Sequence, residues 1–187
     1  MDLPVIPQKG KKQLTLTRDC EALQIPSGEK YKLSQGEHVV LMQTHGGFTI
    51  RTECGYLVRI AGSDADAIGL SAPSVSEIPT ESGPFHIDQV MAALQTVFDP
   101  EIPVNIVELG LVYLCEEHPL ETGGHKVTIE MSMTAPGCGM GDVLKEDAKK
   151  AIMAISGVTE ADVTIVWEPP WNQSRMSEAA RLQLGML

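Results

Sequence analysis

One cysteine lies where its thiol could react or bind a metal. Cys138 stands between Gly137 and Gly139, in a loop that precedes a predicted helix over residues 141–155. Backbone N–H groups and the positive end of the helix dipole stabilise a thiolate, the form that attacks electrophiles and binds soft metals. Thr134, at the end of the preceding strand, could bond the loop backbone or a ligand. The alternative is a buried cysteine that packs as a small apolar side chain, and the residues alone favour neither interpretation.

Two carboxylates form a second candidate site. Asp99 and Glu101 flank Pro100 at the end of a predicted helix over residues 86–98. A helix C-terminus disfavours negative charge, so metal binding or a partner contact would explain two acids there. The alternative is a solvated turn, and without further context the residues favour it because Asp and Glu are mostly exposed.

The remaining reactive side chains indicate no further site. The four cysteines lack C-x-x-C spacing, which disfavours a zinc-finger site, and the five histidines match no histidine metal motif. Cys115 is expected to pack in an apolar strand. Asp64 and Asp66 could bind a cation, but a turn or a helix cap is favoured because a cation needs several more oxygen ligands. Nucleophile-elbow, phosphate-loop and dinucleotide motifs do not occur.

The composition limits the class of protein. The chain has 187 residues, 43% of them hydrophobic, which is enough for a packed core and excludes wholesale disorder. Its net charge of −11 argues against nucleic acid as a main partner. No apolar run approaches the roughly 20 residues of a membrane span, and the first residues do not resemble a signal peptide. A cytoplasmic protein with free thiols is therefore expected.

Charge and composition change near residue 80. Residues 1–80 carry a net charge of −1 and residues 81–187 a net charge of −10, and the Pro- and Ser-rich stretch Ser71–Pro84 lies between them. We predict a β-rich domain over 1–75, a linker over 76–84 and a second domain over 85–187. Short β-rich runs between glycine turns indicate a small barrel or meander, with strands at Tyr31–Leu33, His38–Gln43, Phe48–Glu53 and Tyr56–Ile60.

The second domain alternates helix and strand. Val127, Ile129, Met131 and Met133 alternate with polar residues, so one face of that strand is expected to be buried. Helices are predicted at 86–98, 141–155 and 176–184, and further strands at 111–115 and 163–167, with a connection at 117–125. The fold class is therefore α+β, with helices on a mixed three- to four-stranded sheet in an α/β sandwich after the β-rich domain.

Several segments together resemble a known family. Asp99 to Tyr113 reads DPEIPVNIVELGLVY and Thr134 to Cys138 reads TAPGC, and both resemble the motifs of the iron–sulfur cluster assembly domain shared by SufT- and PaaD-type proteins. The segments Trp167–Trp171 and Met176–Arg181 are similar to the C-terminal stretch of the longer SufT branch. The N-terminal part is also similar to that branch, at Pro26–Glu29, Gly46-Gly47 and Asp64–Gly69.

The resemblance implies an auxiliary factor in iron–sulfur protein maturation that is not an enzyme. It implies that Cys138 is the key thiol and a candidate iron or cluster ligand, with Asp99, Glu101 and Thr134 lining the same site. Clusters are normally held by four cysteine thiolates, and the motif supplies one. We therefore expect transient iron or cluster binding, no tightly bound cofactor, and a homodimer or a complex with the assembly machinery and client apo-proteins.

Two other interpretations stay open. Cys138 could be the nucleophile of an enzyme, which would require a general base within hydrogen-bond reach. The chain could also be a protein-interaction adaptor with a structural cysteine, in which the β-rich domain and Trp171 bind partners. Trp171 follows two prolines and could equally cover the edge of the core. Neither nucleic acid nor a membrane is expected as a partner.

Overall fold

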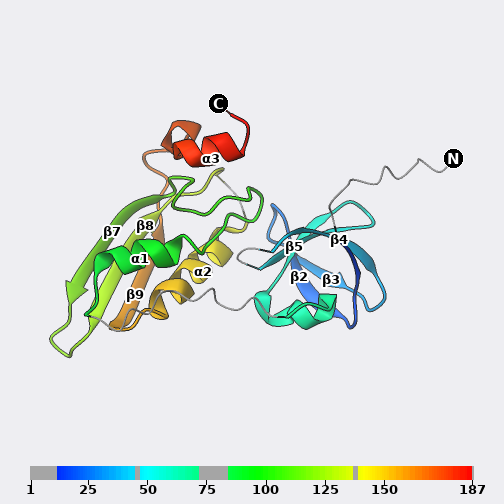
Figure 1. The fold of residues 1–187 in the computed structure, drawn as a ribbon, viewed down its shortest axis with the longest axis horizontal. Helices are drawn as coiled ribbons and strands as arrows, with labels where there is room; N and C mark the ends of the chain where they lie inside the picture. Colours follow the sequence, from blue (N-terminus) through cyan, green and yellow to red (C-terminus); the bar gives the residue numbers. More distant parts are fainter. Residues whose placement is uncertain (1–11, 45–46, 72–83, 137–138, 187) are drawn as a thin grey trace.

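Two β-sheets, one in each half of the chain, form the frame of the molecule (Figure 1). The structure is a computed structural model that describes residues 12–44, 47–71, 84–136 and 139–186. It confirms the predicted α+β class. The predicted linker lies outside the described residues, except for Pro84. Within the described part, each helix is too short or too polar to span a bilayer.

The first half forms a six-stranded antiparallel sheet in the order β1-β4-β5-β6-β2-β3. Its strands are β1 (Gln13–Thr15), β2 (Cys20–Gln24), β3 (Lys30–Leu33), β4 (His38–Gln43), β5 (Phe48–Thr52) and β6 (Leu57–Ile60). The buried cluster of this half includes Leu33, Ile50 and Val58, which are fully buried. A 3₁₀ segment, η1 (Gly62–Ile68), adds Ala65, Ala67 and Ile68 to it. We call this half the six-stranded domain.

Four strands of this sheet are predicted from the sequence, with bounds within one residue of those observed. The prediction misses β1 and β2. β1 has three residues, and β2 reads CEALQ, whose Glu and Ala are poor strand formers. β2 owes its conformation to pairing with β3 and to long-range pairing with β6, where Leu23 lies opposite Arg59.

The second half forms a three-stranded sheet in the order β7-β8-β9 with α1 and α2 on one face (Figure 1). Its elements are α1 (Ile87–Leu94), β7 (Val112–Pro119), β8 (His125–Met131), α2 (Gly141–Met153), β9 (Val158–Ile165), η2 (Gln173–Arg175) and α3 (Glu178–Gln183). β7 and β8 are antiparallel, and β8 and β9 are parallel. A parallel pair needs a long crossover, which α2 supplies. The order of helices and strands is the predicted one.

Three predicted boundaries are wrong. The connection expected at 117–125 is shorter and spans 120–124, because β7 continues to Pro119 and β8 starts at His125. Pro119 is tolerated because β7 is an edge strand. The helix expected at 86–98 ends at Leu94, since Phe98 instead forms a β-bridge with Asn105. The strand expected at 163–167 begins earlier, at Val158.

Each half has a buried cluster of its own. The second cluster gathers α1, α2 and the three strands around side chains that include Leu94, Ile129, Leu144 and Ile152, all fully buried. It shares no residue with the cluster of the six-stranded domain. This separation supports the proposed division into domains at 1–75 and 85–187. We call the second half the assembly half.

Candidate functional site

The segment Asp99–Glu101 forms a tight turn that its own aspartate stabilises. Asp99 Oδ1 accepts hydrogen bonds from the backbone N–H groups of Glu101 (2.8 Å) and Ile102 (2.9 Å). The Asp99 N–H donates to Val104 O at 3.1 Å, so the chain folds back on itself at this point. Asp99 is 2% exposed. It is therefore a buried carboxylate with a structural task, and not the solvated turn residue that its type alone favours.

The two acids of this turn differ in exposure. Burial raises the pKa of Asp99, and the two backbone N–H groups and the charge of Arg59 oppose this shift. Burial and then the neighbouring charge of Asp99 raise the pKa of Glu101, although its side chain is largely exposed. Glu101 can therefore reach a ligand from solvent, whereas Asp99 can do so only if the turn changes.

The cysteine loop connects β8 to α2. Gly137 and Cys138 lie outside the described residues, so the structure does not place the predicted thiol. Their neighbours are described: Thr134 is half-buried, and Gly139 is exposed. Met140, which directly precedes α2, is fully buried. The predicted transition from strand to helix at this loop is confirmed.

The six-stranded domain contacts both motif segments. Gln43 Nε2 donates to Asp99 O, and Thr49 Oγ1 donates to Pro100 O, each at 3.4 Å. On the other segment, the Gly139 N–H donates to Pro26 O at 3.1 Å. The β2–β3 turn and the strands β4 and β5 thus lie directly against the residues that the sequence identifies as the candidate site.

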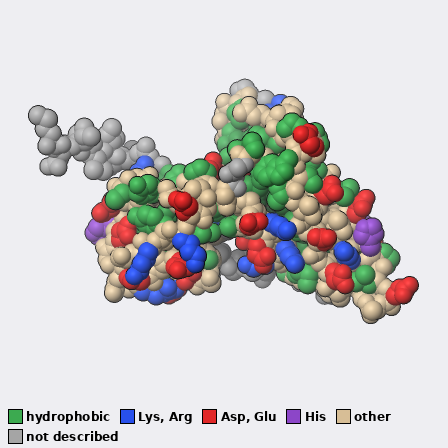
Figure 2. All heavy atoms as spheres, turned by 180° about the vertical axis from the view of Figure 1, so that it is seen from behind, with side chains coloured by type: hydrophobic (Ala, Val, Ile, Leu, Met, Phe, Trp, Pro, Cys, Tyr) green, Lys and Arg blue, Asp and Glu red, His purple; other side chains and the backbone are tan. Residues whose placement is uncertain are grey.

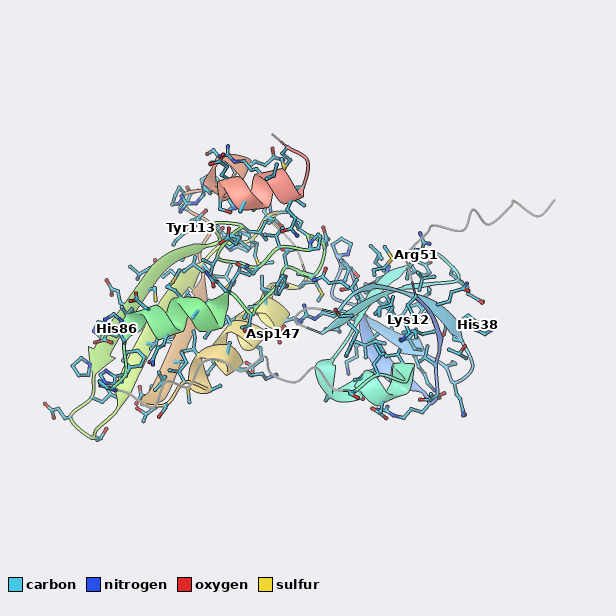
Figure 3. All side chains as sticks on the ribbon, in the orientation of Figure 1. Lys12, His38, Arg51, His86, Tyr113 and Asp147 are labelled. Carbon is cyan, nitrogen blue, oxygen red and sulfur yellow. The ribbon has the colours of Figure 1, made fainter. Side chains whose placement is uncertain are left out.

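An ion pair crosses the same interface. Arg59 on β6 pairs through Nη2 with Asp147 Oδ2 on α2, and the Arg59 side chain is 8% exposed. Figure 3 shows Asp147 on the side of the assembly half that faces the six-stranded domain. Burial raises the pKa of Asp147, and Arg59 and Lys150 oppose the shift. The sequence analysis misses both residues: Arg59 lies in an apolar strand and Asp147 in a helix, without a motif that links them.

Trp171 lies at the edge of the core of the assembly half. Its Nε1 donates to Leu109 O at 2.7 Å, and its ring packs against the buried cluster. Nearby, the guanidinium of Arg175 stacks 3.8 Å from the centre of the Tyr113 ring. The half-buried ring favours the core-edge interpretation of Trp171, and its role in binding a partner stays a prediction.

The other polar candidates have structural partners. Arg18 pairs with Asp64 at 2.8 Å and with Asp66 at 2.7 Å, so these acids form ion pairs with an arginine that the sequence analysis did not consider. Cys115 packs against the core as expected, and burial raises the pKa of its thiol. Among the described residues, no group of three or more His, Cys, Asp and Glu side chains could hold a metal ion.

Residues 87–163 match a family described as iron–sulfur cluster assembly protein. A protein of Porphyromonas gingivalis named Fe-S protein maturation auxiliary factor is 39% identical over 101 residues, which are 54% of this chain and 91% of that protein. The Fe-S protein maturation auxiliary factor SufT of Staphylococcus aureus is 37% identical over 90 residues, 48% of this chain and 98% of that protein. A crystal structure of a DUF59 domain from Bacillus anthracis is 38% identical, covers 54% of this chain and 92% of its own, and has a TM-score of 0.47.

Proposed function

The chain belongs to the family of iron–sulfur cluster assembly proteins, and we propose that it is an auxiliary factor in iron–sulfur protein maturation that acts through the thiolate of Cys138. The main support for the proposal is the position of the family match within the chain. The matched residues 87–163 contain both the Asp99–Glu101 turn and the cysteine loop. The relatives that are named maturation factors match this chain over nearly their whole length.

The chemistry of the two segments supports a role in handling iron. Cys138 precedes the first residue of α2 by three positions, and the start of a helix favours a thiolate. Carboxylate oxygen is a second ligand type for iron, and Glu101 is an exposed carboxylate on the other motif segment. In this proposal Cys138 is the primary ligand, Glu101 and Asp99 add oxygen ligands, and Thr134, Gly137 and Gly139 shape the loop.

The cargo is an iron ion or an iron–sulfur cluster that passes through the protein. A cluster takes four thiolates, and the other cysteines of the chain are poorly suited to supply them. Cys20 is buried in the six-stranded domain, Cys115 packs against the core, and Cys54 is exposed on the six-stranded domain. We therefore propose that a second copy of the chain, the assembly machinery or a client apo-protein completes the ligand set, and that no cluster is bound tightly.

A carrier role is favoured over an enzyme with a cysteine nucleophile. The described histidines have other neighbours: His38 bonds Thr15, His125 stacks on Phe85, and His86 and His118 line a pocket beside Cys115. None of these contacts involves the described residues of the cysteine loop. Figure 2, which shows the molecule from behind, has Lys and Arg side chains interspersed with Asp and Glu on the visible face, and this pattern favours a protein partner over nucleic acid.

The test compares Cys138→Ser with Cys54→Ser, a matched loss of one thiol at an exposed position. Each variant replaces the native protein in cells, and the activity of an iron–sulfur enzyme is measured together with iron and sulfide in the anaerobically purified protein. We expect Cys138→Ser to abolish the contribution to client activity and the bound iron, and Cys54→Ser to leave both unchanged. Equal client activity in the two variants would refute the proposed role of Cys138.

A further inference from the structure

The contacts between the two halves gather on the candidate site. Three hydrogen bonds from the six-stranded domain reach the backbone of Asp99, Pro100 and Gly139, and the Arg59–Asp147 ion pair lies on the adjoining helix. Two of these bonds use backbone oxygens of the assembly half, and the third uses its backbone N–H. These hydrogen bonds involve backbone atoms, whose positions change with the conformation of the chain. Docking of the six-stranded domain therefore depends on the conformation of both motif segments.

The β2–β3 turn lies directly against Gly139, on the side where a side chain would project. A Cβ atom on Gly139 would lie 1.8 Å from the backbone oxygen of Ser27, and a Cβ on Gly28 would lie 2.3 Å from the backbone oxygen of Gly139. Both distances are far below any van der Waals contact. A partner protein that approached this face of Gly139 would therefore have to displace the turn.

The rest of the interface is less tightly packed. A groove of about 560 Å³ opens between the halves, with Leu41 and Met42 on one side and Phe98 and Pro103 on the other. A domain interface that is incompletely filled permits relative motion, unlike a continuous core. The contact between the halves is thus suited to open and close.

The family match does not include the six-stranded domain. It begins at residue 87, and the matched relatives account for about half of this chain. The assembly function of the family therefore does not require this domain. Residues 81–187 also carry a net charge of −10, so a partner of this half is expected to present basic side chains, as Arg59 does to Asp147.

We propose that the six-stranded domain is an intramolecular cover that occupies the surface around Asp99, Pro100 and Gly139, and that it must undock before a basic partner protein binds there. The proposal rests on the proposed function for the nature of the partner. Docking of the cover and binding of the partner exclude each other, so a change that weakens docking raises the apparent affinity for the partner, by up to the same factor.

The experiment compares two glycine variants of the full chain. Gly28 (φ 73°) and Gly69 (φ 68°) have similar backbone conformations, so an alanine is similarly strained at either position. Only at Gly28 does the new Cβ meet the assembly half, whereas nothing lies within 4 Å of a Cβ on Gly69. Hydrogen exchange is measured on peptides that cover 97–104 and 139–147, and the activity of a client iron–sulfur enzyme is measured in cells at equal protein level.

We expect Gly28→Ala to accelerate exchange in both peptides at least about threefold and to raise client activity at least about twofold, because the open population grows. Gly69→Ala should match wild type in both measurements. Unchanged exchange in Gly28→Ala would refute the docking of the β2–β3 turn on the assembly half. Faster exchange with client activity at or below the wild-type level would refute the proposal that the six-stranded domain blocks partner binding. It would show instead that the domain supports the site. If Cys138→Ser leaves client activity unchanged, the proposed function fails, and the exchange measurement still decides whether the domain docks.

Discussion

Arg59 and Asp147, 88 residues apart in the chain, form an ion pair that joins β6 of the six-stranded domain to α2 of the assembly half. The Arg59 side chain is 8% exposed and the Asp147 side chain 28% exposed, so water screens this pair less than a surface salt bridge. It is the most enclosed of the ion pairs in the described part of the chain, and it lies on the same interface as the bonds to both motif segments.

Replacement of Arg59 is expected to destabilise the protein. In Arg59→Gln the carboxylate of Asp147 keeps its burial and loses its charged partner, which should lower the free energy of unfolding by about 2 kcal/mol. Urea denaturation measures the loss. Arg51→Gln, on the neighbouring strand β5, is the control and should change stability by less than about 0.5 kcal/mol. A loss of the same size in both variants would show that the ion pair contributes nothing specific.

Substitution of Asp99 can separate its structural task from iron binding. Asp99→Asn keeps an oxygen that accepts the N–H groups of Glu101 and Ile102, so its stability should remain within about 1 kcal/mol of wild type. Asp99→Ala leaves both N–H groups without this acceptor and should lose about 2–3 kcal/mol. Thermal unfolding and iron content are measured on both variants. Full iron content in a stable Asp99→Asn protein would remove Asp99 from the proposed ligands.

The thiol of Cys115 should titrate at higher pH than an exposed cysteine. Burial raises its pKa above the ordinary value of 9.0, so the folded protein retains the proton when the unfolded chain has already lost it. Its contribution to stability is therefore complete below pH 9 and decreases as the pH rises above 9. The pH profile of Cys115 alkylation by iodoacetamide, read by mass spectrometry, should lie at higher pH in the folded protein than in the urea-unfolded chain. Coincident profiles would contradict the effect of burial.

Trp171 should contribute to stability through its indole N–H. Trp171→Phe preserves an aromatic ring and removes the hydrogen bond to Leu109 O, with an expected loss of about 1 kcal/mol. Trp167, 48% exposed, is the matched control, and Trp167→Phe should change stability by less than about 0.5 kcal/mol. Chemical denaturation measures the free energy of unfolding of both variants. An unperturbed Trp171→Phe protein would return this residue to the role of a surface contact for partners.

Sequence patterns predict those parts of the fold that depend on local periodicity. The alternation in β8 correctly places Val127, Ile129 and Met131 in the core, since each is fully buried. The apolar stripe of α2 is confirmed by Leu144 and Ile152, which are also fully buried. Both patterns need only residues that are close in sequence.

Features that depend on distant partners escape the same reasoning. β2 has a weak strand pattern and is held by pairing with β6, more than 30 residues later. Arg59 resembles an ordinary strand residue until α2 places Asp147 beside it. The burial of Asp99 is a further example. Its hydrogen bond from the Glu101 N–H is local, but Gln43, which donates to Asp99 O, comes from the other half of the chain.

The six-stranded domain precedes the assembly half in the chain, and this order has a consequence for synthesis. Its sheet is complete at Ile60, and the ribosome reaches Asp147 roughly 4 to 18 seconds after Arg59 at ordinary rates of translation, because 88 residues separate them. Gly139 and α2 therefore leave the ribosome after a domain that has had time to fold. The turn that holds Ser27 and Gly28 would already be formed when Gly139 reaches it, before the completed protein meets any other molecule.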